Sequence, residues 1–139
     1  MKISTKGRYG LTIMIELAKQ YGGGPIPLRQ IAADKELSEA YLEQLVSPLR
    51  NAGLVKSVRG AYGGYMLAHK PNKISAADVI RVLEGPIQPV EGIENEEAPQ
   101  RELWMRIRDA VKNVLDTTTI EDLAKYTNNE VTDGYMFYI

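Results

Sequence analysis

Small and hydrogen-bonding side chains line one side of a helix that the sequence predicts within residues 38–65. They belong to Ala40, Glu43, Gln44, Ser47 and Asn51, and none of them is a lysine or a large apolar group. Leucine and valine recur at i, i+3, i+4 and i+7 on the other side, which is the spacing of a buried helix face. Amide and carboxylate groups on a slim polar face can reach the hydrogen-bonding groups of base edges. The chemistry that this pattern favours is recognition of double-stranded DNA.

A glycine-rich turn with a basic residue follows this helix. Residues 54–58 and 65–68 are predicted strands, and Arg59 begins the turn that joins them. Turn residues between two short apolar segments are typical of a β-hairpin. Ser38 can cap the preceding helix through its hydroxyl group. A capped helix followed by a hairpin with a basic tip predicts a winged helix-turn-helix.

Two further helices are predicted to hold this unit from the N-terminal side. Ser4 or Thr5 can cap a first helix that runs to about residue 20, and its two apolar flanks require cover from two directions. We expect one cover from the helix-turn-helix and the other from the C-terminal helix or a second subunit. A second helix spans residues 28–34, and a four-residue turn separates it from the recognition helix. Pro48 predicts a kink or a tightening within that helix.

The second half of the chain is predicted to be helical around one acidic loop. Ser75 and Asp78 form a capping-box pattern for a helix that ends at Gly85. Residues 85–100 contain three prolines and four glutamates and predict a solvated loop, since their spacing does not match a calcium loop. A last short helix to about residue 126 begins with one of two capping pairs, Thr118 with Glu121 or Thr119 with Asp122.

Residues 101–115 carry the strongest helical pattern of the chain. Apolar residues alternate in steps of four and three, which is the seam of a packed helix pair. Because most DNA sites have two-fold symmetry, we expect part of the facing surface to come from a second copy of the chain. The predicted dimerisation residues are Leu103, Trp104, Ile107, Ala110, Val111 and Val114.

The length and composition are those of one soluble domain. The chain has 139 residues, of which 44% are hydrophobic and 25% charged. We expect a mainly α fold with a small β-hairpin wing, in which residues 1–84 form the DNA-binding region. Residues 85–139 supply the acidic loop, the dimerisation helix and the tail of the same compact unit. Without a signal peptide or an apolar run of membrane-spanning length, the expected location is cytoplasmic.

The net charge of −1 conceals a polarised distribution. Residues 1–70 carry ten Lys or Arg against five Asp or Glu, which is a net +5, and residues 71–139 carry a net −6. The basic half coincides with the predicted helix-turn-helix. A basic face is the electrostatic footprint expected of a nucleic-acid-binding surface.

The chain has no cysteine and a single histidine, His69. Thiolate metal sites and iron–sulfur ligation are therefore excluded, and we expect no cofactor and no metal. Nucleophilic catalysis would have to depend on His69 alone, and the acidic loop offers its carboxylates no apolar pocket. The sequence does not predict an enzyme.

The predicted DNA-binding set combines basic side chains, the polar helix face and the hairpin turn. We expect Arg59 to enter a minor groove, the helix face to lie in the major groove, and the residues at the helix start to lie near the sugar–phosphate backbone. The set is Lys2, Lys6, Arg8, Ser38, Ala40, Tyr41, Glu43, Gln44, Ser47, Lys56, Arg59 and Gly60.

Three groups of segments in register resemble the Rrf family of bacterial winged-helix regulators. They are residues 1–10, residues 41–45 with 49–55, and residues 57–60 with 63–65. The resemblance runs to about residue 85 and implies the winged-helix fold and DNA binding. Cluster-binding members carry three cysteines in the segment that corresponds to residues 85–100. This chain has none there, so the resemblance does not extend to an iron–sulfur or nitric-oxide sensor.

Residues 84–87, 103–111 and 133–139 are also similar to the cysteine-metabolism repressors of that family. This similarity implies a homodimer that represses sulfur-uptake and cysteine-synthesis genes together with the enzyme cysteine synthase. It also implies that the C-terminus enters a pocket of that enzyme, because a terminal carboxylate can be captured by backbone N–H groups. The alternative is that the tail packs on the body of the dimer. The partner-binding set is Tyr135, Phe137, Tyr138 and Ile139.

A winged-helix module that binds only other proteins is the alternative function. The basic N-terminal half and Arg59 argue against it, because a wing that binds only protein has no need of a basic tip. Retention on heparin that collapses with salt would separate the two functions.

Overall fold

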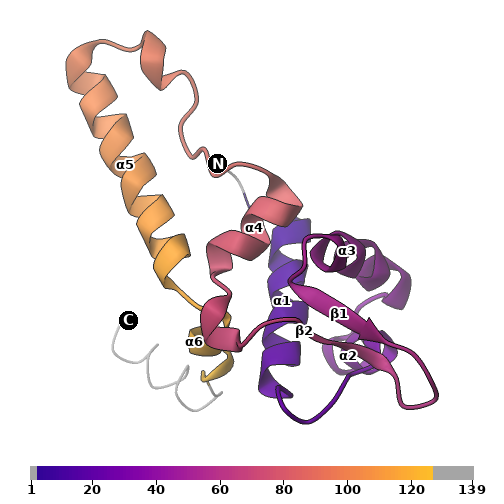
Figure 1. Cartoon of the computed structure of the whole chain (residues 1–139). Coiled ribbons are helices and arrows are strands. Elements are labelled where there is room, and N and C mark those ends of the chain that lie inside the picture. Colours follow the sequence, from indigo (N-terminus) through magenta and orange to yellow (C-terminus); the bar gives the residue numbers. More distant parts are fainter. Residues whose placement is uncertain (1–2, 127–139) are drawn as a thin grey trace, which may run out of the picture.

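The computed structural model describes residues 3–126, so Lys2 and the partner-binding set of the tail lie outside the described residues. Six α-helices and one antiparallel hairpin form this part of the chain, which confirms the expected mainly α fold with a wing (Figure 1). Two short 3-10 helices, Pro71–Lys73 and Ile93–Asn95, lie in the connections. The helices and strands are α1 Thr5–Lys19, α2 Leu28–Lys35, α3 Glu39–Asn51, β1 Val55–Val58, β2 Gly64–Leu67, α4 Ala76–Glu84, α5 Ala98–Thr117 and α6 Ile120–Ala124.

Helix α1 lies at the centre of the core. Its residues Ile13, Met14 and Leu17 are buried, and it contacts α3, β2, α4 and α6. The expected cover from two directions is present. The helix-turn-helix covers one side, and α4 together with α6 covers the other. The covering role of α4 did not follow from the sequence, whereas the apolar stripe of α3 is buried as its spacing predicts.

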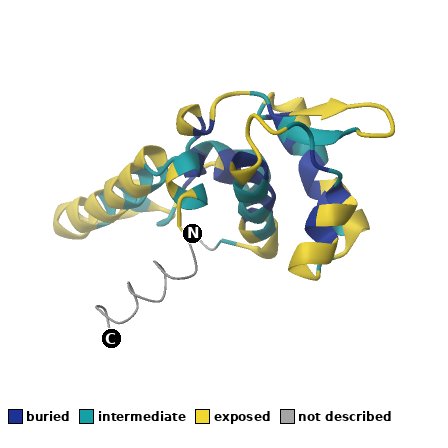
Figure 2. Ribbon diagram, turned by 90° about the horizontal axis from the view of Figure 1, so that it is seen from below, coloured by how far each residue is buried: buried dark blue, intermediate teal, exposed yellow. Residues whose placement is uncertain are grey.

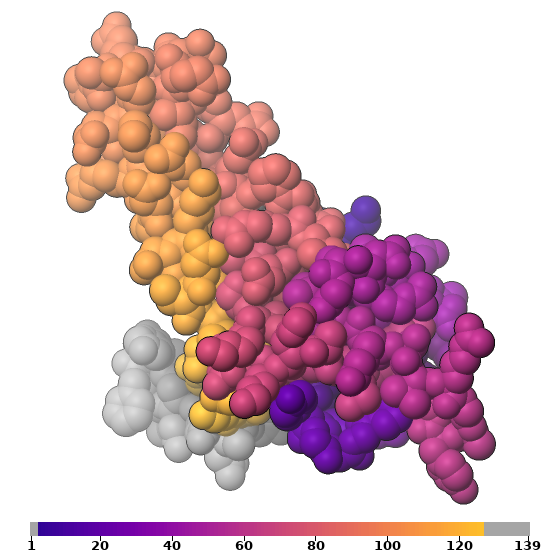
Figure 3. All heavy atoms as spheres, viewed as in Figure 1, coloured from indigo at the N-terminus to yellow at the C-terminus, as the bar shows by residue number. Residues whose placement is uncertain are grey.

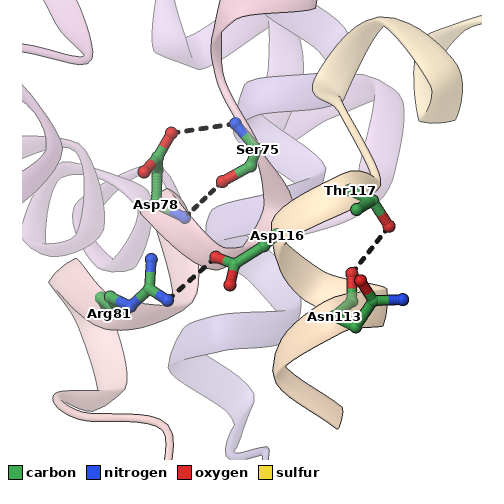
Figure 4. A network of polar contacts seen from close by, with 6 residues as sticks. All are labelled: Ser75, Asp78, Arg81, Asn113, Asp116 and Thr117. Atoms are coloured by element: carbon green, nitrogen blue, oxygen red, sulfur yellow. Dashed lines mark hydrogen bonds and ion pairs between the residues drawn. The ribbon is translucent and has the colours of Figure 1, made fainter. Parts of the chain in front are cut away.

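The predicted helix caps are present and fix the boundaries of the elements. Ser4 accepts a hydrogen bond from the backbone N–H of Lys6, and Ser38 accepts one from the backbone N–H of Tyr41. Ser75 and its capping-box partner begin α4 (Figure 4). Of the two pairs considered for α6, the structure has Thr119 with Asp122, and the hydrogen bonds from Thr119 lower the pKa of that carboxyl group.

Pro99 does not lie in the loop that the sequence predicts for residues 85–100. Helix α5 begins at Ala98 and includes this proline in its first turn. A proline is tolerated there because the N–H that it lacks would have no acceptor within the helix. Helix α3 continues through Pro48 as far as Asn51, and the N–H of Ala52 then donates to the Pro48 carbonyl over 3.0 Å.

Helix α5 stands out from the body of the molecule, and none of its residues is fully buried (Figures 1 and 2). Only its C-terminal half packs inward, where Val111 and Leu115 contact a small cluster formed by Ala77, Ile80 and Ile87. An ion pair of 2.9 Å between Arg81 and Asp116 ties α5 to α4 at the same place (Figure 4). Among the helices of residues 3–126, none combines the length and the hydropathy needed to cross a membrane.

Candidate nucleic-acid interface

The polar face of α3 is presented to solvent by the burial of the opposite face. Leu42, Leu45 and the other apolar stripe residues are inside the core, so the helix cannot rotate about its axis. Glu43 and Gln44 are exposed, and neither side chain forms a hydrogen bond or an ion pair within residues 3–126. Ala40 is exposed as well, and Ser47 is half-buried beside them. This face therefore offers one acceptor-only and one amide side chain whose hydrogen-bonding groups are not used by the fold.

The start of α3 is held in place by an aromatic contact with α1. The rings of Tyr41 and Tyr9 meet edge to face, with centroids 5.9 Å apart and planes at 88°. Such pairs add roughly 0.5–1.5 kcal/mol beyond area burial. Ser38, which precedes the helix, is exposed. Ser38 and Tyr41, which are predicted to lie near the sugar–phosphate backbone of DNA, are thus both located where α3 begins. Tyr41 also packs against α1.

The hairpin projects from the body beside α3 as a separate ridge (Figures 1 and 3). Val55 and Leu67 face each other in the register and are buried, which anchors its base. At the tip, the N–H of Gly63 donates to the carbonyl of Gly60 over 3.0 Å, with Gly60 at φ 114°. A side chain at that φ would be strained, so glycine suits the turn.

The basic residues of the hairpin lie on the projecting part. Lys56 on β1 and Arg59 at the turn are both exposed, and neither is paired with a carboxylate within the described residues. A guanidinium group on a narrow protruding turn can enter a groove too narrow for a helix. The structure thus separates Arg59 from the α3 face and places the two on different elements.

Tyr62 is a further exposed residue of the tip and lies outside the predicted DNA-binding set. Its exposed fraction is 95%, so its ring contributes almost nothing to the packing of the chain. An aromatic residue within a glycine-rich turn is the signal that identifies it, because a hairpin tip cannot reach the core. A fully exposed ring on the same turn as Arg59 is a candidate contact for DNA.

Lys6 and Arg8 lie in the first turns of α1, and both are exposed. The Nε of Arg8 donates to the carbonyl of Ile3 over 3.4 Å, which leaves its terminal nitrogens unused by the fold. These two residues therefore belong to a third element, distinct from α3 and the hairpin, on which basic groups are available.

The predicted dimerisation residues are largely uncovered. Leu103, Ile107 and Val114 are 46%, 39% and 61% exposed, and Ala110 is exposed as well. Large apolar side chains repeated along one helix face indicate an interaction surface. Trp104 is half-buried, and Val111 also packs against the small cluster beneath α4. Val111 therefore supports the attachment of α5 in addition to facing an open apolar hollow lined by Ile3 and its α5 neighbours.

The described residues contain no arrangement typical of metal binding. Within residues 3–126, no group of three or more His, Cys, Asp or Glu side chains lies close enough to hold a metal ion. His69, the one histidine of the chain, is exposed. The arrangement of α3 with the basic hairpin instead defines a winged helix-turn-helix regulator of transcription that binds DNA.

Comparison with known proteins identifies the family. The chain belongs to the Rrf2 family, described as iron-dependent transcriptional regulators, which matches residues 3–126. The regulator CymR of Bacillus subtilis is 71% identical over 139 residues, covering 100% of both proteins. The regulator IscR of Xenorhabdus nematophila is 36% identical, covering 96% of this chain and 84% of that protein.

A solved structure of CymR, the global cysteine regulator of B. subtilis, shares the fold with a TM-score of 0.88. It is 72% identical and covers 92% of this chain and 99% of that chain. These relatives are transcriptional regulators rather than enzymes. Although the family is described as iron-dependent, this chain has no cysteine with which to ligate an iron–sulfur cluster.

Proposed function

We propose that the chain acts as a homodimeric repressor of cysteine and sulfur metabolism genes in the bacterial cytoplasm. The observation that carries this proposal is the pairing of an exposed polar face on α3 with an exposed basic hairpin tip. The high identity to CymR over the full length supports the choice of regulated genes. Binding of an operator by such a repressor would exclude RNA polymerase from the promoter.

The two elements divide the work of reading DNA. Glu43 and Gln44 can contact base edges in the major groove, because a carboxylate accepts from cytosine N4 and an amide pairs with adenine. Arg59 supplies positive charge for a narrow minor groove. The basic residues of α1 are suited to phosphates, which position the protein but carry no sequence information.

A second copy of the chain completes the proposed DNA-binding unit. The exposed seam of α5 is apolar enough to be covered, and pairing two copies through it would present two α3 helices to one duplex. The division into residues 1–84 for DNA and 85–139 for dimerisation follows from this proposal. The contacts between α4 and α5 support treating both parts as one compact unit.

Cysteine synthase is the proposed co-regulator, and the C-terminal residues 135–139 are its proposed contact. The support is the similarity to the cysteine-metabolism repressors together with the aromatic, isoleucine-ended sequence of the tail. Deleting Ile139 alone tests this contact. Loss of cysteine synthase binding with an unchanged melting temperature supports it. Intact binding, or a loss explained by unfolding, assigns the tail to packing.

The experiment that tests the function is selection of bound fragments from random double-stranded DNA. The full chain should enrich a sequence with two-fold symmetry, and added cysteine synthase should change its occupancy. Failure to enrich any sequence, with retention on heparin that does not respond to salt, would favour the protein-interaction module instead.

A further inference from the structure

One carboxylate oxygen joins two segments that lie far apart in the sequence. Glu84 is the last residue of α4, and its Oε1 accepts hydrogen bonds from the backbone N–H of Ser4 over 3.0 Å and of Gly7 over 2.9 Å. The hydroxyl group of Ser4 donates to the same oxygen. The end of α4 therefore closes over the beginning of α1 through three donors.

These contacts provide an acceptor for N–H groups at the start of α1 that have no partner within the helix. The first N–H groups of an α-helix have no acceptor within the helix, and a negative charge at that end interacts favourably with the helix dipole. The side-chain bond from Ser4 is the main cause that lowers the pKa of Glu84. The N–H groups of Gly7 and Ser4 and the nearby charge of Lys6 add to the effect, while burial opposes it. Glu84 is thus held as a carboxylate at neutral pH.

Two glycines of α1 face the end of α4. A Cβ added to Gly7 would lie 2.8 Å from Oε1 of Glu84, and one added to Gly10 would lie 2.0 Å from a methyl carbon of Leu83. Both glycines are buried under α4. A side chain at Gly7 would displace the carboxylate of Glu84 from the position in which it accepts from the backbone of the first turn.

Helix α4 is attached to two other helices. It binds the start of α1 through Glu84 and binds α5 through the ion pair of Arg81. The first turn of α1 that Glu84 holds is also the turn from which Lys6 and Arg8 project. The position of this first turn is therefore set by α4, the same helix to which α5 is attached.

We propose that Glu84 is a positioning residue for DNA binding, which fixes the first turn of α1 so that Lys6 and Arg8 meet the phosphate backbone. This proposal rests on the proposed function. Loss of Glu84 leaves the start of α1 without its acceptor, and the two cations then lose their defined place on the duplex.

The direction in which DNA affinity changes on substitution of Glu84 separates a positioning role from a simple effect of charge. Removing a carboxylate near Lys6 makes that surface more positive, which by itself strengthens binding to phosphates. Glu84→Ala and Glu84→Gln remove the same charge, but only the glutamine side chain keeps an oxygen that can accept from Ser4 and Gly7. A positioning role predicts weaker binding for the alanine variant and recovery in the glutamine variant.

The test measures the affinity of the full-length variants for the duplex that the unmodified chain selects, at several salt concentrations. Glu84→Ala should bind about tenfold more weakly, with a salt slope smaller by about one to two, as expected when phosphate contacts are lost. Hydrogen exchange at the Gly7 amide should accelerate in that variant. Asp122→Ala, which removes a capping carboxylate from α6, is the matched control and should leave DNA affinity unchanged.

Equal or tighter binding by both Glu84 variants would overturn the positioning role. A loss in Glu84→Ala that follows a loss of dimer in sedimentation would also overturn it, since the effect would then be one of assembly. Failure of the unmodified chain to select any DNA would overturn the proposed function itself. The rate of exchange at Gly7 in the free protein reports on the contact independently of DNA.

Discussion

Arg59 and Glu43 carry opposite charges on neighbouring elements, and both are exposed without a partner among the described residues. These two charges contribute little to the stability of the fold, because an isolated surface charge adds little to the free energy of folding. It makes sense for reading DNA, where a cation gains from the negative potential of a groove and a carboxylate gains only from a matching base. Removing Arg59 and removing Glu43 should therefore have different effects on DNA affinity and on sequence preference.

Arg59→Ala should reduce affinity for the selected duplex by about 1–3 kcal/mol, because its guanidinium loses a narrow groove of concentrated negative potential. Glu43→Ala should relax sequence preference more than it weakens binding, since the lost carboxylate also repelled phosphates. Competition between the selected duplex and a random duplex measures both effects. An equal loss on the two DNAs for both variants would contradict the assignment.

The carboxyl group of Glu84 predicts a specific acid dependence of stability. Its pKa is lower in the folded chain than in the unfolded chain, so its stabilisation is present above its ordinary carboxyl value and is lost as pH falls through the folded value. Urea unfolding of the unmodified chain and of Glu84→Ala should therefore differ at pH 7 and converge in acid. A difference that stays constant from pH 7 to about pH 3 would show that the contact does not involve the ionised group.

At the scale of elements, the hairpin depends on one close backbone approach. Two hydrogen bonds of 2.9 and 2.8 Å join Ile26 to Tyr65, which attaches β2 to the segment before α2. The adjacent Gly64 lies so close that an added Cβ would be 2.3 Å from the carbonyl carbon of Ile26. The glycine therefore serves the attachment of the wing to the helix-turn-helix.

Gly64→Ala should destabilise the fold by at least the roughly 1–3 kcal/mol of an overpacked site, since backbone atoms rather than a flexible side chain stand in the way. Gly53→Ala is the control. Gly53 also has a positive φ, of 81°, but nothing lies within 4 Å of an added Cβ. Urea midpoints should fall more for Gly64→Ala than for Gly53→Ala. Equal midpoints would mean that backbone strain alone, not the contact with Ile26, governs both positions.

The seam of α5 is the second element whose role can be tested by substitution. Ile107→Glu places a charge on the apolar face that is proposed to be covered in the dimer, where an unpaired charge is costly. It should give monomers in sedimentation and lose DNA binding without changing any DNA-contacting residue. Asn113→Glu adds the same charge to a polar, exposed position of the same helix and should remain dimeric. A dimeric Ile107→Glu variant would contradict the proposal that this face of α5 is the dimer contact.

Elements with strong local signals could be predicted from the sequence, and those that depend on distant partners could not. The buried stripe of α3 and the cap of Ser75 follow from spacing and hydroxyl chemistry within a few residues. The contact of Glu84 joins segments about eighty residues apart, and no local pattern indicates it. The sequence pattern places the start of α5 at about residue 101 and the structure places it at Ala98, because Pro99 suits either a loop or a first helical turn.

At the scale of the whole described chain, residues 3–126 form a compact body that contains the hairpin, and helix α5 projects from it (Figure 1). The positive N-terminal half and the negative C-terminal half follow roughly the same division. A duplex would be attracted to the body and repelled by the acidic loop, which favours one orientation of the protein on DNA. A dimer formed through α5 would present two such bodies to one duplex.

The most direct test of this account is a hydroxyl-radical footprint of the full-length chain on the duplex that it selects. Two bodies joined through α5 should protect two equivalent half-sites whose centres lie one helical turn, about 10–10.5 base pairs, or a whole multiple of it apart. The footprint should disappear with Ile107→Glu at the same protein concentration. A single protected half-site that persists in that variant would contradict the dimeric regulator at the centre of the account.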